Sequence, residues 1–256
     1  MEMWAGSIVH ETIAEALNRY AHKGRAIRTG ELQARARYKL RTGWVESVNR
    51  EWEKSPKRNN LIELYYGNGK TLPKERTDGI RDLVYGCLEA FAESTILGEI
   101  LAVPYMNWKP VDQLDSFQID GTKVWCAIDF AYTAPDGVLH VIDWKTGKSE
   151  SESLRQQLAC YAFFAKTRWA ATMPTMSLAG VFLRDDARRS HYDITDQDLV
   201  DVQESILSSA AAMRAKLVDV ENNVPMDEDA FRLCENERIC SRCNFKEVCP
   251  AVAEIA

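Results

Sequence analysis

Hydrophobic side chains in the first hundred residues recur at the spacing of an α-helix. Ile13, Leu17 and Tyr20 fall three or four residues apart, so they lie on one side of a helix. This pattern predicts helices over residues 7–22, 30–54 and 74–101. Pro56 ends or turns the second helix, and the prolines of segment 104–110 predict a loop.

After residue 110 the pattern changes to short runs rich in β-branched and aromatic residues, which are typical of strands. The runs are SFQIDG (116–121), KVWCAIDFAYTA (123–134), VLHVIDWKTG (138–147), MSLAGVFLR (176–184) and RSHYDIT (189–195). Pro135-Asp136-Gly137 supplies turn residues between the second and third runs, so we expect a hairpin there. Helical patterns return over 151–168 and 196–219.

This order of elements predicts an α/β or α+β core with a helical N-terminal part. The 256 residues suit one sizeable domain with a small appendage. No stretch approaches the ~20 apolar residues of a membrane span. The N-terminal sequence MEMWAGSIVHETIAEAL lacks a basic start and reads as an amphipathic helix. We therefore expect no signal peptide, no membrane contact and a cytoplasmic location.

Asp143 and Lys145 interrupt an otherwise apolar strand. Side chains of a strand alternate between its faces, so these two project on one face and Trp144 on the other. The predicted hairpin brings Asp129 beside Asp143, and two adjacent carboxylates repel unless a cation lies between them. Mg²⁺ is bound in this way, by one or two carboxylates with waters and phosphate oxygens. The alternative is a surface hairpin whose charges are solvated.

Two further polar pairs occur at helical spacing. His10 follows Gly6 by four residues and shares a helix side with apolar residues, so it points inward, as a core histidine or as a neighbour of a metal site. Gln157 and Tyr161 lie four residues apart on the helix after the Asp143 strand. A glutamine on that apolar face needs a hydrogen-bond partner, unless it lies at the boundary with solvent.

Taken in order, these residues resemble the motifs of the PD-(D/E)XK nuclease superfamily, and IDWKTG is especially similar to its RecB-type branch. The resemblance implies a restriction-endonuclease-like core, in which helices flank a central mixed sheet. It implies catalytic roles for Asp129, Asp143, Lys145, Gln157 and Tyr161. His10, Asp129 and Asp143 would bind or adjoin Mg²⁺ or Mn²⁺.

The resemblance also implies a substrate and a setting. It points to a DNA nuclease, by default an exonuclease on single-stranded or frayed ends, in recombination, repair, CRISPR adaptation or phage DNA metabolism. The sequence has no G-x-x-x-x-G-K-[ST] motif, so unwinding driven by ATP would need a helicase or another recombination or CRISPR partner. The alternative function is a non-catalytic, cysteine-stapled module that binds DNA ends or a partner protein.

Seven cysteines occur, and three of them, Cys87, Cys126 and Cys160, lie in apolar surroundings typical of a core. The other four, Cys234, Cys240, Cys243 and Cys249, lie within sixteen residues. Without an export signal, a metal site is favoured over disulfides. Four thiolates suit structural Zn²⁺ and an iron–sulfur cluster equally well.

The last three cysteines, followed by Pro250, resemble the 4Fe–4S staple of the AddB, exonuclease V and CRISPR-associated RecB-like groups. In those families the fourth ligand precedes the histidine helix, but no cysteine precedes His10 here, so either an upstream segment is missing or the fourth ligand comes from elsewhere. Cys234 is the candidate fourth ligand and Cys87 the alternative. We therefore expect a nuclease domain over 1–219, with a helical part to residue 110 and a catalytic core over 111–219, and a metal-binding tail over 220–256.

Charge is unevenly distributed. The chain has a net charge of −6, but residues 23–58 hold eleven basic and four acidic residues, so that window is +7 and the remainder −13. The window predicts either a solvated helix face or a basic arm that follows a phosphate backbone, with Arg35, Lys39 and Arg41 as DNA-binding candidates.

Overall fold

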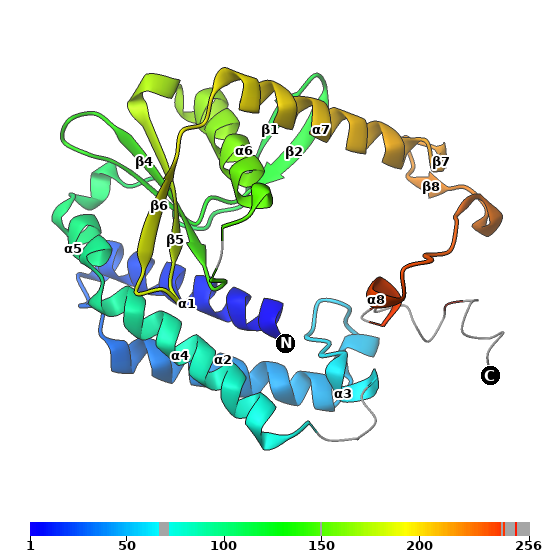
Figure 1. Cartoon of the computed structure of the whole chain (residues 1–256), viewed down its shortest axis with the longest axis horizontal. Coiled ribbons are helices and arrows are strands. Elements are labelled where there is room, and N and C mark those ends of the chain that lie inside the picture. The colour runs from blue at the N-terminus through cyan, green and yellow to red at the C-terminus, as the bar shows by residue number, and fades with distance from the viewer. Residues whose placement is uncertain (67–71, 149, 242, 244–248, 250–256) are drawn as a thin grey trace.

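A four-stranded mixed sheet lies at the centre of the protein (Figure 1). The computed structural model describes residues 1–66, 72–148, 150–241, 243 and 249. The sheet consists of β3 (Phe130–Thr133), β4 (Leu139–Lys145), β5 (Met176–Phe182) and β6 (Arg188–Tyr192), in that spatial order. β4 and β5 are parallel, and the two outer pairs are antiparallel. The predicted fold class, a central mixed sheet flanked by helices, is confirmed.

Helix α6 (Glu152–Trp169) supplies the crossover that a parallel β4–β5 pair requires. It packs on one face of the sheet, where Val141 and Leu178 contact a hydrophobic cluster that includes Leu158. The opposite face carries Ile142 and Trp144, which pack against the N-terminal helices. Alternate residues of β4 therefore serve two different cores, as the period of a strand dictates.

Three long N-terminal helices, α1 (Glu2–Lys23), α2 (Thr29–Val48) and α4 (Lys74–Glu93), form a layer under the sheet (Figure 1). The short α3 (Glu63–Tyr66) lies near the end of α2, and α5 (Thr95–Ala102) lies beside the sheet. Short 3₁₀ turns follow α2 at Glu51–Glu53 and α5 at Tyr105–Asn107. The prediction of one helix over 74–101 is wrong, because Ser94 adopts an extended conformation and its Oγ accepts the Leu97 N–H at 3.2 Å, which caps a new helix.

The run 123–134 is also divided, although the sequence predicts one strand. β2 (Thr122–Cys126) pairs with β1 (Asp115–Ile119) in a separate hairpin, and the chain then leaves β geometry before β3 begins. The turn at Pro135-Asp136-Gly137 is as expected. The Ala134 and Gly137 backbones are hydrogen-bonded, and Gly137 has a φ of 85°.

The C-terminal part leaves the sheet along α7 (Asp196–Arg214), which begins at a capping box formed by Thr195 and Asp198. The helix ends five residues before the expected boundary. The last residues of the predicted helix instead form β7 (Leu217–Asp219), which pairs with β8 (Val224–Pro225), and a 3₁₀ turn at Glu228–Ala230 and α8 (Glu237–Cys240) follow. Pro250 lies outside the described residues. Within the described ranges, no helix combines the length and the apolar character that a bilayer span requires.

Candidate active site

The end of β4 places an acid and a base on the face that meets α6. Asp143 is fully buried, and Lys145 is partly exposed at the end of the strand. Trp144 projects to the opposite face, where its ring meets Phe91 edge to face at 5.3 Å between centroids. The alternation expected from the sequence is therefore confirmed, and the indole fixes the face on which Asp143 lies.

Asp129 directly precedes β3, and the antiparallel pairing of Phe130 with Ile142 brings it beside Asp143 of β4. Its Oδ2 accepts the Trp144 N–H at 2.8 Å, which ties the carboxylate to the strand that carries Asp143. Its Oδ1 lies 3.2 Å from Nδ1 of His10, which α1 brings in from the other end of the sequence. The structure thus brings His10, Asp129 and Asp143 to one place.

Gln157 and Tyr161 of α6 hold Lys145 against Asp143. The Lys145 ammonium lies 2.7 Å from Asp143 Oδ2 and donates a hydrogen bond of 2.7 Å to Gln157 Oε1. Gln157 Nε2 donates to the Tyr161 hydroxyl at 2.8 Å, and that hydroxyl donates to Asp143 Oδ1 at 3.3 Å. The glutamine therefore has the polar partner that its apolar helix face required.

Burial makes ionisation of Asp143 costly. Desolvation, followed by repulsion from Asp129, raises the pKa of Asp143 to about 6, although Lys145 and His10 oppose the shift. Desolvation and the same two carboxylates raise the pKa of Tyr161, so its hydroxyl stays protonated as a donor. Two acids in one dry site favour an added cation.

The pKa of His10 is raised. Burial alone would lower it, but the hydrogen bond and charge of Asp129, aided by Asp143, outweigh that effect. With the Nδ1 hydrogen directed to Asp129, Nε2 of the neutral ring is left as an acceptor. The His10 ring therefore belongs to the cluster of acids, and its role as a neighbour of a metal site stays a prediction.

A cavity of about 480 Å³ opens beside this cluster. His10 and Lys145 line it, together with Gly6, Thr146 and Asp112. A Cβ on Gly6 would approach Thr146 Oγ1 to 3.2 Å, so the glycine allows α1 to lie close to the end of β4. The cavity gives a substrate access to His10, which contacts Asp129, and to Lys145, which contacts Asp143.

The side chains of this site suit Mg²⁺ or Mn²⁺ better than they suit a metal ion whose ligands all come from the protein. In the described part of the chain, no three His, Cys, Asp or Glu side chains are arranged to hold a metal ion. Asp143 Oδ2 is fully buried, and its partner there is the Lys145 ammonium at 2.7 Å. Mg²⁺ needs only one or two carboxylates and completes its shell with waters and substrate phosphate.

The three basic candidates lie in different environments. Arg35 pairs with Glu15 at 3.0 Å, and Lys39 pairs with Glu11 at 2.7 Å and with Glu15 at 2.8 Å. Arg41 has no ion pair or hydrogen bond among the described residues. The acidic side of α1 therefore balances much of the charge that the sequence concentrated in α2, and a role for Arg35 and Lys39 in DNA binding stays a prediction.

The tail cysteines approach one another. Cys240 Sγ contacts the Cys234 carbonyl at 3.3 Å, and the Cys243 N–H donates to the Cys240 carbonyl at 3.2 Å. Desolvation, a hydrogen bond with the Cys234 thiol, and the charges of Cys234, Cys243 and Cys249 raise the pKa of Cys240. Cys87, the alternative fourth ligand, is instead buried in the core, where desolvation raises its pKa to about 11.

Sequence reasoning missed Asp112 in this site. Asp112 adopts a φ of 48°, and burial followed by the charge of Asp129 raises its pKa. It lies on the loop before β1 and lines the cavity beside His10. No sequence motif includes Asp112, and its position in a loop does not distinguish it from a solvated aspartate.

Comparison with known proteins supplies one family. The model of the PD-(D/E)XK nuclease superfamily matches residues 2–250. No curated protein matches the chain. A solved structure described as "Crystal structure of SSO0001" is 19% identical and aligns over 68% of this chain and 78% of its own, with a TM-score of 0.30. A likeness at that level supports no structural conclusion.

Proposed function

Because the chain belongs to the PD-(D/E)XK nuclease superfamily, we propose that it is a Mg²⁺- or Mn²⁺-dependent DNA nuclease of the RecB-type branch, cutting from single-stranded or frayed ends. The observation that carries the proposal is the position of Lys145. Its ammonium is held between Asp143 and Gln157, both at 2.7 Å, at the edge of a cavity.

In this proposal Asp129 and Asp143 would hold the divalent cation, with His10 as a further ligand or as the group that orients Asp129. When bound there, the ion would lower the pKa of a water and offset charge on the phosphate. Lys145 donates a hydrogen bond to the attacking water or to a phosphate oxygen. A fixed donor aimed at developing charge is usually the largest electrostatic contribution to such a reaction.

Gln157 and Tyr161 are positioning residues. Gln157 restricts Lys145 by accepting one ammonium hydrogen, and Tyr161 in turn fixes the amide of Gln157 and one oxygen of Asp143. The long lysine side chain would otherwise lose roughly 2 kcal/mol of rotamer entropy when it adopts one geometry. Because the network fixes Lys145 when the protein folds, this entropy is not lost again in each catalytic cycle.

For the tail, we propose that Cys234, Cys240, Cys243 and Cys249 bind a 4Fe–4S cluster, with Zn²⁺ as the alternative. The contact of the Cys240 thiol with the Cys234 carbonyl, at 3.3 Å, supports a common site for these two cysteines. The absorption spectrum of anaerobically purified protein separates the two metals, because the cluster is coloured and Zn²⁺ is not. A colourless protein that contains zinc would contradict the cluster and leave the nuclease proposal intact.

End-labelled DNA tests the activity. We expect cleavage of linear single-stranded DNA with Mg²⁺ or Mn²⁺, none in EDTA, and slow or no cleavage of a closed single-stranded circle. Cleavage of the circle at the same rate would show an endonuclease. DNA binding without cleavage under all of these conditions would favour a non-catalytic binding module.

A further inference from the structure

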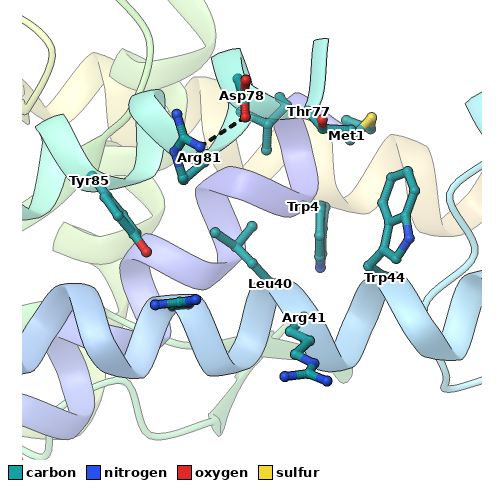
Figure 2. Close-up of a pocket in the computed structure, with 11 residues that line it drawn as sticks. Met1, Trp4, Leu40, Arg41, Trp44, Thr77, Asp78, Arg81 and Tyr85 are labelled. Carbon is teal, nitrogen blue, oxygen red and sulfur yellow. Dashed lines mark hydrogen bonds and ion pairs between the residues drawn. The ribbon is translucent and has the colours of Figure 1, made fainter. Parts of the chain in front are cut away.

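A second cavity, of about 620 Å³, lies between α1, α2 and α4 (Figure 2). It is lined by Met1, which precedes α1, and by Trp4 of α1, whereas α1 contributes Met3, Gly6, Ser7, His10 and Glu11 to the active-site cavity. The two cavities therefore both have residues of α1 in their walls, and Trp4 lies only about 9 Å along the helix from His10.

Aromatic rings from three different helices line this second cavity. Trp4 comes from α1, Trp44 from α2 and Tyr85 from α4, and all three are only partly buried. In Figure 2 the two indoles lie toward one end and Tyr85 toward the other, with Leu40 between them. Partly exposed aromatic faces in a cavity are suited to a flat partner that stacks on them.

The position of Trp4 depends on a glycine of the facing helix. A Cβ on Gly43 would overlap the Asn59 amide nitrogen and lie 2.9 Å from Cζ2 of the Trp4 indole, closer than real contacts allow. Glycine inside a helix costs about 1 kcal/mol relative to alanine, and here it leaves space for both the Asn59 amide and the Trp4 indole at the cavity wall.

Positive charge accompanies the aromatic rings. Arg37 and Arg41 lie one turn apart on α2 and line the same cavity, and both are exposed. Across the described ranges, neither makes an ion pair or a hydrogen bond. By contrast, Arg81 is bound by Asp78 at 2.8 Å and by Asp82 at 2.7 Å. The cavity therefore offers two uncompensated guanidinium groups beside stacking surfaces.

We propose that this cavity binds an unpaired nucleotide of the DNA strand, a few nucleotides from the bond that the active site cuts. The inference rests on the proposed nuclease function. Every base has a π-face that stacks on aromatic rings, and the adjacent phosphates bind guanidinium groups, so recognition is independent of sequence. A paired base stays inside its duplex, so the cavity selects single-stranded or frayed ends.

Photocrosslinking and binding test this proposal without any cleavage. Full-length protein is mixed with a single-stranded oligonucleotide that carries 5-iodouracil, in buffer without divalent cation, and is irradiated. We expect crosslinks on Trp4, Trp44 or Tyr85. Trp44→Ala should weaken binding of the oligonucleotide roughly tenfold, the loss of one base–aromatic stack. Trp44→Phe, which keeps a ring, should restore most of it.

Matched controls separate stacking from folding. Trp125 is 59% exposed on β2, outside the cavity, so Trp125→Ala should bind as the wild type does. The double variant Arg37→Ala/Arg41→Ala changes only exposed side chains. It should flatten the slope of log K against log[salt] by roughly 1.4, since each single-strand phosphate contact contributes about 0.7. Arg168→Ala, which removes a guanidinium paired with Asp115, should keep the wild-type slope.

The outcomes distinguish this proposal from the nuclease assignment. If the wild type binds single strands but crosslinks map elsewhere, and the Trp44 and arginine variants bind normally, the cavity has another occupant, such as an apolar segment of a partner protein. The proposal is then overturned while cleavage stands. If the wild type neither binds nor cuts DNA, both proposals fail. Equal binding of blunt duplex and single strand would also overturn the cavity's role.

Discussion

Tyr161 donates its hydroxyl hydrogen to Asp143 Oδ1 across 3.3 Å, so a side chain of α6 binds the carboxylate of β4 directly. Because the Tyr161 hydroxyl oxygen also accepts from Gln157 Nε2, Tyr161→Phe leaves that amide donor without an acceptor and loosens the hold of Gln157 on Lys145. We expect cleavage to slow about tenfold and stability to fall by roughly 1–3 kcal/mol, the cost of leaving a buried polar group unsatisfied. Single-turnover cleavage and urea unfolding measure these effects.

Tyr105, 59% exposed, provides the control for that substitution. Tyr105→Phe removes a hydroxyl outside the network and should leave both values unchanged. Normal cleavage by Tyr161→Phe would show that Lys145 is positioned without α6.

Without metal, Asp143→Asn should stabilise the protein at neutral pH. Burial and then Asp129 raise the pKa of Asp143 from 3.8 to about 6, so the native chain holds a proton that the unfolded chain has released. The resulting stability is fully present below the unfolded pKa and is lost as pH rises through the folded one. Asparagine does not titrate, so the free energy of unfolding of the variant should exceed that of the wild type by roughly 1–3 kcal/mol at neutral pH. We expect a value toward the low end of this range, because Lys145 loses its counter-ion in the variant.

Thermal unfolding in EDTA between about pH 4.5 and 8 measures this advantage against the wild type. Adding Mg²⁺ at the upper pH should stabilise the wild type and not the variant, because only the native wild type binds the ion. A difference that stays flat across the pH range would mean that Asp143 ionises freely in the fold.

Gly6→Ala should slow cleavage although alanine favours a helix. The added methyl group would lie 3.2 Å from Thr146 Oγ1, so α1 or the end of β4 must shift beside Lys145. At Gly86 of α4 no heavy atom lies within 4 Å of an added Cβ, so Gly86→Ala should gain up to about 1 kcal/mol of stability and keep full activity. Equal activity of the two variants would show that the close approach at Gly6 is unimportant for the site.

Metal content tests the cysteine ligands. Cys243→Ser and Cys234→Ser should each lower the bound metal per chain and the melting temperature, because a missing thiolate opens a closed four-ligand site. Cys87→Ala should keep the metal, since Cys87 is buried in the core. Metal retained in Cys234→Ser and lost in Cys87→Ala would reverse the assignment of the fourth ligand.

The sequence predicted the parts of the site that follow a local period. Alternation in β4 separated Asp143 and Lys145 from Trp144, and the four-residue spacing on α6 placed Gln157 and Tyr161 together. The break between β2 and β3 was hidden, because KVWCAIDFAYTA is β-prone throughout and only long-range pairing of β1 with β2 divides it. The break at Ser94 depends on one cap within an otherwise helical pattern.

Charge was the least predictable property. The sequence counts Arg35, Lys39 and Arg41 alike, but Glu11 and Glu15 of α1 pair with the first two. Those carboxylates lie more than fifteen residues away and are brought near only by helix packing. For the same reason the aromatic cavity was not foreseen, because Trp4, Trp44 and Tyr85 meet only when three helices pack together.

The central claim is that Lys145 and the two acids form a hydrolytic site. Its most direct test is single-turnover cleavage of end-labelled single-stranded DNA in saturating Mg²⁺ by Lys145→Ala, with Lys166→Ala as the control. Lys166 lies on the same helix as Gln157 but is exposed and 4.0 Å from Asp196. Removal of one fixed electrostatic donor predicts a loss of about 10²-fold or more for Lys145→Ala, measured at a temperature where the variant is folded, and a wild-type rate for Lys166→Ala. A Lys145→Ala protein that cuts at the wild-type rate would contradict the account.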